Sequence, residues 1–336
     1  MRRLSALIVL VILPIGARAA GPIPDLKGTI ERGLTFLAKD NLAWKEKNKC
    51  AECHHAPFTI WALNEGKKQG YAVDEEALAE LTSWVLTKDH LAKLFPKPPK
   101  QEQIVVNEAP LLLALGIEAG NAKATQEGLK HMLASLLRDQ GKDGSWKLDL
   151  EFRPIGSSPD TLTALALLAL TAPNAPDLGK EGKAARERGL HWLRAARSDD
   201  ELQAAALRLI LWRRLGLPST EWEPLVKKMR GTQNADGGWG QTKKAKSDAY
   251  ATGQALYALA EAGVNPGDEA VRKAQSFLAK TQRPDGAWTM PSRAIFRNGK
   301  PATNLEPITH AGSAWAVMGL VRSSRAVTKS GSTAPR

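Results

Sequence analysis

The heptapeptide QRPDGAW at Gln282–Trp288 decides the fold, because the chain contains its pattern three times. The other two copies are QGKDGSW at Gln140–Trp146 and QNADGGW at Gln233–Trp239. The copies are separated by close to two units and then one unit of about 47 residues, and a period of this size indicates a repeat architecture. The conserved pattern predicts one recurring turn built by Gln140, Gly144, Trp146, Gln233, Gly237, Trp239, Gln282, Gly286 and Trp288.

Each unit is predicted to contain two helices. An amphipathic pattern precedes the heptapeptide, as in 269–282, and a more apolar pattern rich in small residues follows it, as in 247–263. Such a pair is typical of an outer helix with one exposed face and an inner helix that is buried nearly all round. Asp-Gly supplies the turn between the helices. We expect Gln to bond free backbone groups and Trp to pack on the neighbouring unit.

Six such pairs account for the chain after its first residues. Because the inner helices are small and apolar, we expect an all-α protein whose units close into an α/α toroid around a central cavity. The stretch FLAKDNLAW at 36–44 resembles FLAKTQRPDGAW at 277–288 with three residues deleted, and we interpret it as a degenerate first copy. Outer helices are predicted at 25–40, 74–88, 123–139, 179–197, 219–233 and 267–282, and inner helices at 54–68, 107–119, 159–171, 200–215, 247–263 and 306–322.

The heptapeptides resemble the QW motifs of squalene–hopene and oxidosqualene cyclases, and similar repeats occur in the β-subunits of protein prenyltransferases. The resemblance covers essentially the whole mature chain and implies the α/α toroid fold and an isoprenoid-like apolar substrate. Such cyclases use a D-x-D-D acid motif, which this chain lacks; its nearest string is SDDE at 198–201. Fold resemblance alone does not establish an activity. We therefore do not expect a standard squalene–hopene cyclase, and whether the protein is an enzyme stays open.

The resemblance also raises the question of a zinc site. Prenyltransferase β-subunits bind zinc through Asp, Cys and His, and SDAYATGQAL at 247–256 resembles the segment that carries the Asp and the Cys. By that match Asp248 stands at the Asp position and Ala249 at the Cys position, while His310 is a possible third ligand. Two ligands without a thiolate make a poor zinc site, so zinc and standard prenyltransferase chemistry are not expected. Asp248 and His310 remain the candidate catalytic residues.

The first 19 residues read as a secretory signal peptide. Arg2 and Arg3 precede an apolar run at 4–15 that is too short to span a bilayer, and Ala17-Arg18-Ala19 fits a cleavage site after Ala19. We therefore predict a secreted or periplasmic, soluble protein with at most peripheral membrane contact. A single toroid domain is expected at 20–324, followed by a disordered tail at 325–336. The formal charge is +12, but the basic residues are scattered, which argues against nucleic-acid binding.

The segment KCAECHHAP at 49–57 holds both cysteines of the chain. Cys50, Cys53 and His54 have the C-x-x-C-H spacing by which a c-type haem is attached, with His54 as the iron ligand. Three alternatives stay open: a Cys50–Cys53 disulfide, free thiols with His54 and His55 at a helix start, and a metal site without haem. The segment is an insertion, at 50–55, in the turn of the first unit.

Several inner helices begin at an acid or a histidine. A closed ring would bring these starts to one rim, and the first and last units would be neighbours there. Asp at a helix start usually caps the helix, whereas His caps poorly. A rim site formed by His54, His55, Asp248 and His310 is therefore a second hypothesis for the location of a metal.

Three functions remain at this point. The leading one is an exported toroid with covalently attached haem c that acts in redox or ligand binding, with a redox partner or a small-molecule ligand. The second is an enzyme or binding protein for an isoprenoid-like apolar substrate in the central cavity, without haem. The third is a non-catalytic scaffold in which Cys50 and Cys53 form a structural pair.

Overall fold

The computed structural model describes residues 25–49, 54–87, 114–117, 123–147, 158–173, 175–196, 201–293, 300 and 302–324. The predicted signal peptide, both cysteines, most of the predicted inner helix at 107–119 and the tail at 325–336 lie outside these residues. Within the described ranges the helices are joined by turns and loops, and β-structure is limited to two isolated bridges that join Glu201 to Thr242 and Trp239 to Asp248.

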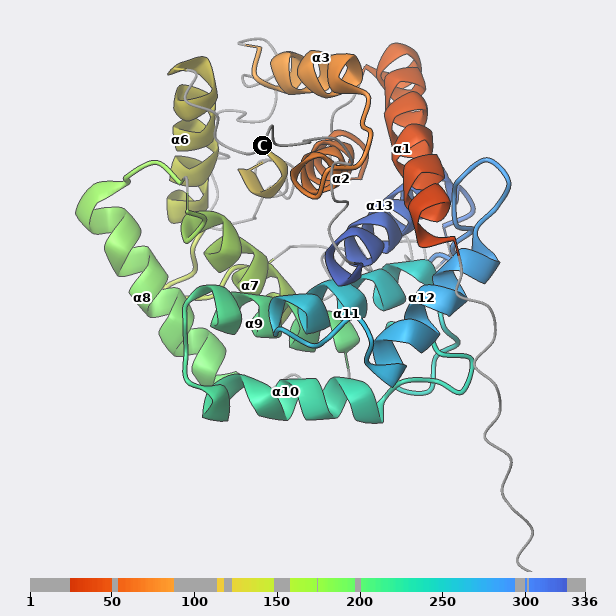
Figure 1. The fold of residues 1–336 in the computed structure, drawn as a ribbon. Helices are drawn as coiled ribbons and strands as arrows, with labels where there is room; N and C mark the ends of the chain where they lie inside the picture. The colour runs from red at the N-terminus through yellow and green to blue at the C-terminus, as the bar shows by residue number, and fades with distance from the viewer. Residues whose placement is uncertain are drawn as a thin grey trace, which may run out of the picture.

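The helices form an outer and an inner ring, which confirms the predicted all-α α/α toroid (Figure 1). A helical turn at 114–116 falls within the second predicted inner helix. The outer helices are α1 (Leu26–Asn48), α3 (Glu75–Val85), α6 (Lys123–Arg138), α8 (Gly179–Ala195), α10 (Ser219–Gly231) and α12 (Glu269–Thr281). The inner helices are α2 (Ala56–Lys68), α7 (Pro159–Leu170), α9 (Leu202–Arg214), α11 (Ala249–Glu261) and α13 (Glu306–Ser323).

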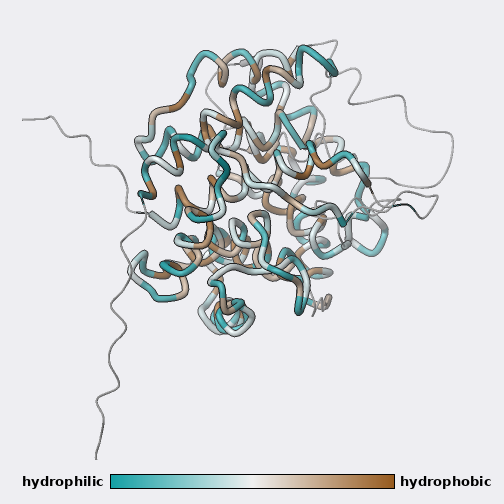
Figure 2. Tube along the Cα trace, turned by 90° about the vertical axis from the view of Figure 1, so that its right-hand side faces the viewer, coloured by the Kyte–Doolittle hydropathy of each residue, from teal (hydrophilic) through white to brown (hydrophobic). Residues whose placement is uncertain are grey.

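Burial separates the two rings as the sequence pattern predicts. Every residue of α7 after its first is buried, and so is every residue of α11 from Ala249 to Leu259. The outer helix α12 buries only Val271, Ala274, Gln275 and Leu278, which lie on one stripe. Figure 2 shows the same distribution, with hydrophobic residues gathered towards the interior and hydrophilic ones on the outer segments.

The three heptapeptides build the same turn. Gly144, Gly237 and Gly286 have φ of 92°, 91° and 93°, and a Cβ on any of them would lie within 2.7 Å of a carbonyl oxygen in the next outer helix. Glycine is therefore required both for the backbone angle and for the close approach. The glutamine at each turn start donates from Nε2 to the glycine carbonyl and to a carbonyl of the next outer helix.

The tryptophans anchor each turn within its own unit. Their Nε1 groups donate to carbonyls of the preceding outer helix, at Leu136, Met229 and Leu278. Trp146 also packs against Gly189 of the next outer helix, and Trp288 packs against Gly33 in the same way. The predicted contact with the neighbouring unit is present, and the hydrogen bond to the unit's own outer helix adds to it.

The third turn closes the ring. Gln282 donates to the carbonyl of Thr29 in α1 and accepts a hydrogen bond from Arg32, while Gly286 lies against the Arg32 carbonyl. The last unit thus contacts the first through the same interactions that join consecutive units elsewhere, and α12 lies beside α1 (Figure 1). Closure brings α1, α2 and α13 together at one place, called here the seam.

The first unit departs from the sequence prediction. The outer helix predicted at 25–40 continues to Asn48, so Trp44 lies inside α1 rather than in a turn. The physical reason is that this degenerate copy has no Asp-Gly, and nothing in it favours a positive φ before Lys49, whose φ is 52°. The longer helix carries Asp40 and Trp44 to the start of α2.

Aromatic side chains fill much of the predicted central cavity. The fully buried Trp315 of α13 lies 5.3 Å from Trp61 and 5.9 Å from Tyr257, measured between ring centroids. Phe58 and Tyr250 also pack on it, each at 6.2 Å. These rings occupy the space between α2, α11 and α13, and a cavity remains at the carboxyl ends of the inner helices.

Candidate functional site

A cluster of polar and aromatic side chains occupies the seam. Asp40 and Trp44 come from α1, His54 and His55 lie at the start of α2, and His310 lies in the first turns of α13. His55 and His310 are fully buried, whereas the Asp40 side chain is 25% exposed. The first unit supplies four members of the cluster, and ring closure adds His310 from the last unit.

Short contacts connect the cluster into a chain. Nδ1 of His54 lies 2.8 Å from Nδ1 of His55, and Nε2 of His55 lies 3.4 Å from Oδ2 of Asp40. The same carboxylate oxygen lies 2.7 Å from Nδ1 of His310, whose Nε2 lies 2.9 Å from Oγ1 of Thr59. One ligand atom from each of Asp40, His55 and His310 lies within 4.8 Å of the others.

Stacked rings hold His55 in place. Its imidazole lies between Trp44, at 4.0 Å and 12° between planes, and His310, at 4.1 Å and 29°. Trp44 also contacts His54 edge-on, with 5.4 Å between centroids. Nε2 of His55 is buried and has no hydrogen-bond partner. A buried polar atom in this state costs free energy unless another group binds there.

Burial decides the charge of the two adjacent histidines. Burial lowers the pKa of His54 to about 4 and that of His55 to about 3, with the nearby His310 adding to both shifts. Burial opposes ionisation of Asp40, but the hydrogen bond from His310 and the close approach of His55 outweigh it and hold the pKa of Asp40 well below its ordinary value. At neutral pH the site therefore offers two neutral imidazoles and a carboxylate, the forms that bind metals.

The structure brings three of the sequence candidates together and separates the fourth. His54, His55 and His310 share the seam, while Asp248 contacts none of them. Asp40 is a member that the sequence reading missed. It sits next to Lys39 in a predicted outer helix, and only the close approach of His55 and His310 distinguishes it from a surface acid. Cys50 and Cys53 lie outside the described residues, between Lys49 at the end of α1 and His54.

Asp248 instead caps α11. Its Oδ1 accepts from the backbone N–H of Ala251, and its Oδ2 accepts from Nε2 of Gln241. His55 stands at the corresponding position of α2 but makes no side-chain cap, as expected for histidine. Burial raises the pKa of Asp248 to about 6, and the two hydrogen bonds offset that rise only in part.

The raised pKa of Asp248 predicts a pH-dependent stability. Between about pH 4 and 6 the folded protein keeps a proton that the unfolded chain has lost, so the free energy of unfolding falls as the pH rises through this window. Asp248→Asn keeps the cap and cannot ionise. The free energy of unfolding of Asp248→Asn, relative to that of the wild type, is expected to rise by about 2 kcal/mol from pH 4 to pH 7.5, since one pKa unit corresponds to about 1.4 kcal/mol. Urea unfolding at both pH values measures this.

A matched control is Asp74→Asn, which alters the exposed cap of α3. Its effect on stability should be the same at both pH values. A difference between Asp248→Asn and the wild type that does not change with pH would contradict the prediction.

Comparison with known proteins gives the fold a name. Residues 246–333 match the family described as the squalene-hopene cyclase C-terminal domain. The chain superposes on the type II terpene cyclase MstE from Scytonema with a TM-score of 0.55 at 16% identity, covering 89% of this chain and 97% of that one. The fold is the α/α toroid of the terpene cyclases.

Similar toroids also occur outside that group. A possible member of the GH105 family from Salmonella enterica gives a TM-score of 0.58 at 13% identity, over 94% of this chain and 98% of that one. A polysaccharide lyase gives 0.55 at 12% identity, over 88% and 97%. No curated protein sequence matches the chain. Identities this low establish the toroid fold and leave the activity to the site.

A cavity of about 300 Å³ remains in the toroid at the carboxyl ends of the inner helices. Ile117, Leu129 and Leu133 contribute an apolar wall. The opposite side is charged, because Nε of Arg322 lies 2.7 Å from Oε2 of the buried Glu65 and Arg214 lies 3.2 Å from Glu261. This cavity is therefore amphipathic, and Trp61 is the one aromatic residue among those that line it.

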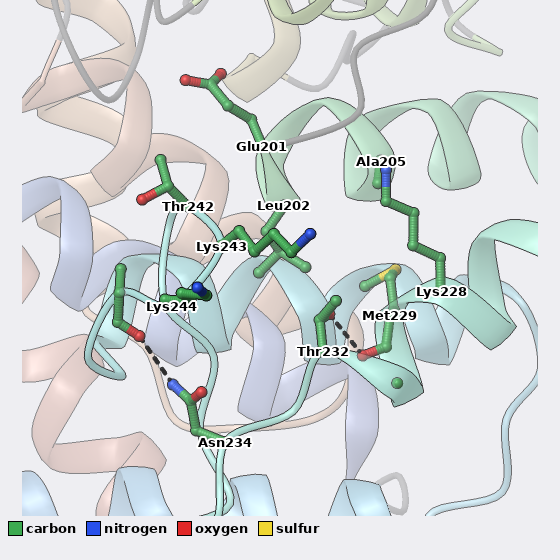
Figure 3. Close-up of a pocket in the computed structure, with 13 residues that line it drawn as sticks. Glu201, Leu202, Ala205, Lys228, Met229, Thr232, Asn234, Thr242, Lys243 and Lys244 are labelled. Atoms are coloured by element: carbon green, nitrogen blue, oxygen red, sulfur yellow. Dashed lines mark hydrogen bonds between the residues drawn. The ribbon is translucent and has the colours of Figure 1, made fainter.

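A second cavity of about 300 Å³ lies between the first turn of α9, the end of α10 and the loop that follows Trp239 (Figure 3). Lys228, Lys243 and Lys244 line it, and in the view of Figure 3 the Lys228 side chain extends towards Ala205 while Lys243 lies in front of Leu202. Glu201 lies at its edge, 3.4 Å from Arg293. The pocket combines these charged groups with apolar surface from Leu202 and Met229, and it shares no residue with the seam. No helix in the described part of the toroid is both long and apolar enough to cross a bilayer.

Proposed function

We propose that this protein is an exported c-type haem protein that acts in redox chemistry or ligand binding. In this proposal Cys50 and Cys53 form thioether bonds to the porphyrin and His54 ligates the iron at the seam. The observation that supports it is the state of the His54 ring. Its Nδ1 is engaged with His55, which leaves Nε2, directly after a C-x-x-C sequence, as the nitrogen available to a metal.

The His54 imidazole has the properties of an iron ligand. Iron takes a neutral imidazole, and burial keeps the pKa of His54 near 4, so the ring is neutral at pH 7. Trp44 packs against the ring edge and His55 fixes its Nδ1, so the orientation of the ligand is set by the fold. When bound, the haem supplies one-electron exchange or binding of a small axial ligand.

The test is covalent attachment. We expect the full chain, exported from cells that contain the haem-maturation machinery, to keep its Soret and α bands after acid–acetone extraction. Cys53→Ser should lose the covalent haem. A colourless wild-type protein that is folded by circular dichroism would overturn the proposal.

A metal ion without porphyrin is a second candidate function, favoured by the unpartnered Nε2 of His55. In this alternative Asp40, His55 and His310 bind the ion, and their ligand atoms already lie within 4.8 Å of one another. His55 would then bind through Nε2 and carry its proton on Nδ1, so Nδ1 of His54 would accept a hydrogen bond from it and Nε2 of His54 would be protonated. The two proposals therefore exclude each other through the tautomer of His54.

Two matched substitutions distinguish the metal ion from the haem. If a metal ion binds, His310→Gln should lose one equivalent of metal by elemental analysis, and His54→Gln should retain it. If haem binds, His310→Gln should keep the covalent haem, while His54→Gln should keep the porphyrin but change the axial ligation seen by absorbance. A wild-type protein free of both haem and metal would overturn both proposals.

An isoprenoid-like ligand without haem is the remaining alternative. MstE forms a complex with geranylgeranyl dihydroxybenzoate, and the cavity beside Leu129 and Leu133 gives this chain an apolar wall. The charged wall opposite favours an amphipathic ligand over a hydrocarbon. Solvent extraction and mass spectrometry of the purified protein should then recover one lipid-like molecule per chain, and an extract without any such molecule counts against this alternative.

A further inference from the structure

The cavity at the carboxyl ends of the inner helices has two unlike walls, one apolar and one that carries two arginines. We propose that it binds a small amphipathic carboxylate, with the anionic head on Arg214 and Arg322 and the apolar chain along the opposite wall. The proposal does not depend on haem, because the cavity shares no residue with the cluster at the seam. It rests on the apolar-ligand alternative above and adds the chemical class of the head group.

The two arginines are held side by side by residues of α11, the helix between theirs. Nη2 of Arg214 in α9 and Nη2 of Arg322 in α13 lie 3.2 Å and 3.0 Å from the same atom, Oε1 of Glu261. Both Nη2 groups also donate to the hydroxyl of Tyr257, over 2.8 Å and 3.3 Å. One edge of each guanidinium group is therefore fixed by the protein.

The other donors of this arginine pair remain available. Within the described part of the chain, Nη1 of Arg214 and Nη1 of Arg322 make no hydrogen bond. Both side chains line the cavity and are 25% and 28% exposed, so a ligand can reach them. Guanidinium N–H groups match the two oxygens of a carboxylate in geometry as well as in charge.

The acidic side chains of this wall leave room for one more negative charge. Glu65 is 3% exposed, and its charge is compensated by Arg322 and by hydrogen bonds from Tyr257 and Trp61. Three basic and two acidic side chains line the cavity, which gives a formal charge of +1. A monoanion balances this charge, whereas a dianion such as a phosphate monoester would leave an excess negative charge.

The apolar wall fits a short hydrocarbon chain. Leu129 and Leu133 lie one helical turn apart on α6, and Ile117 lines the same side of the cavity. The volume of about 300 Å³ is at the lower end of the range for small-molecule sites. We therefore expect a chain of about ten carbons and not a full-length membrane lipid.

The alternative is that Arg214 and Arg322 only stabilise the carboxyl ends of their helices, where cations are favourable. Such a role predicts lower stability on substitution. It predicts no difference in affinity between a carboxylate and an alcohol of the same chain length. A comparison of two such ligands on the wild-type protein therefore separates the two roles.

The experiment is isothermal titration of the purified full chain, freed of copurifying lipid on a hydrophobic resin, with decanoate and with decanol at pH 7.5. Decanoate should bind at one equivalent and at least about tenfold more tightly than decanol, because only the carboxylate gains charge-assisted hydrogen bonds. Butyrate has the same head group but a shorter chain, and should bind at least about a hundredfold more weakly than decanoate.

Matched variants locate the head group. Arg214→Gln should lower the affinity for decanoate about tenfold and leave that for decanol unchanged. Arg214→Lys should recover part of the loss, because it keeps the charge but not the planar fork. Arg230→Gln removes a cation from an exposed pair with Asp268 on the outer surface, and should change neither affinity.

Two results would overturn this inference alone: equal affinities of the wild type for decanoate and decanol, or an unchanged affinity of folded Arg214→Gln for decanoate. A wild-type protein that binds neither ligand would overturn it and count against the apolar-ligand alternative as well. The haem proposal is tested separately by covalent attachment. If Arg214→Gln does not fold, the comparison of decanoate with decanol on the wild type decides the question.

Discussion

Gly253→Ala is expected to destabilise the protein by about 3 kcal/mol or more, one of the two largest effects we predict. A Cβ at this position of α11 would lie 2.2 Å from backbone atoms of Trp315 in α13. Backbone cannot move aside as a flexible side chain can, so the two inner helices would have to separate. Denaturant unfolding with circular dichroism at 222 nm measures the loss.

The neighbouring Gly319→Ala tests the same contact from the other helix, because its Cβ would lie 2.3 Å from the carbonyl oxygen of Gly253. The double variant should cost less than the sum of the two, since one separation relieves both clashes. Gly231→Ala is the matched control. It lies in a helix with nothing within 4 Å and should be neutral or stabilising by up to about 1 kcal/mol. Similar stabilities for Gly253→Ala and Gly231→Ala would contradict the prediction.

Arg322→Met is expected to cost about 3–5 kcal/mol, because it leaves a buried carboxylate without its cation. Glu65 is 3% exposed, and its Oε2 lies 2.7 Å from Nε of Arg322. Its Oε1 accepts hydrogen bonds from Tyr257 and Trp61, and these neutral donors do not replace the lost charge. Thermal and urea unfolding of the variant at pH 7 give the measurement.

The double variant Glu65→Gln with Arg322→Met should recover much of this stability, since no charge is then buried. Lys67→Met is a control on α2, the helix that carries Glu65. It breaks the ion pair between Lys67 and Glu75, whose side chains are 51% and 67% exposed. Its effect should stay within about 1 kcal/mol. If Arg322→Met is no more harmful than Lys67→Met, the pair does not stabilise the toroid.

Arg322 and Gly253 also show where sequence reasoning ends for the interior. The apolar, small-residue pattern of 247–263 correctly predicts a buried inner helix. It gives no indication that α11 and α13 touch through Gly253 and Gly319, or that Trp315 fills the space beside them. Those contacts depend on how far the inner helices approach, which is set by all units of the ring at once.

The candidate site divides in the same way. His54 and His55 are visible as a motif, and the local pattern around His310 places it near the start of an inner helix. Asp40 carries no local signal, and Asp248, which the repeat pattern selects together with the histidines, caps its own helix through local hydrogen bonds. A repeat register predicts the end of the ring at which a residue lies, but not which neighbours its side chain faces.

The sequence by itself determined the architecture of this protein. Its three Q-x-x-D-G-x-W turns require glycine at a positive φ and separate an outer from an inner helix in the units that carry them, and these are local properties of a few residues. Only the tertiary structure decided that the last turn binds α1. The hydrogen bond between them joins residues about 250 positions apart and forms only when the ring closes. The same closure seats His310 against Asp40 and His55, and it converts scattered polar residues into one site.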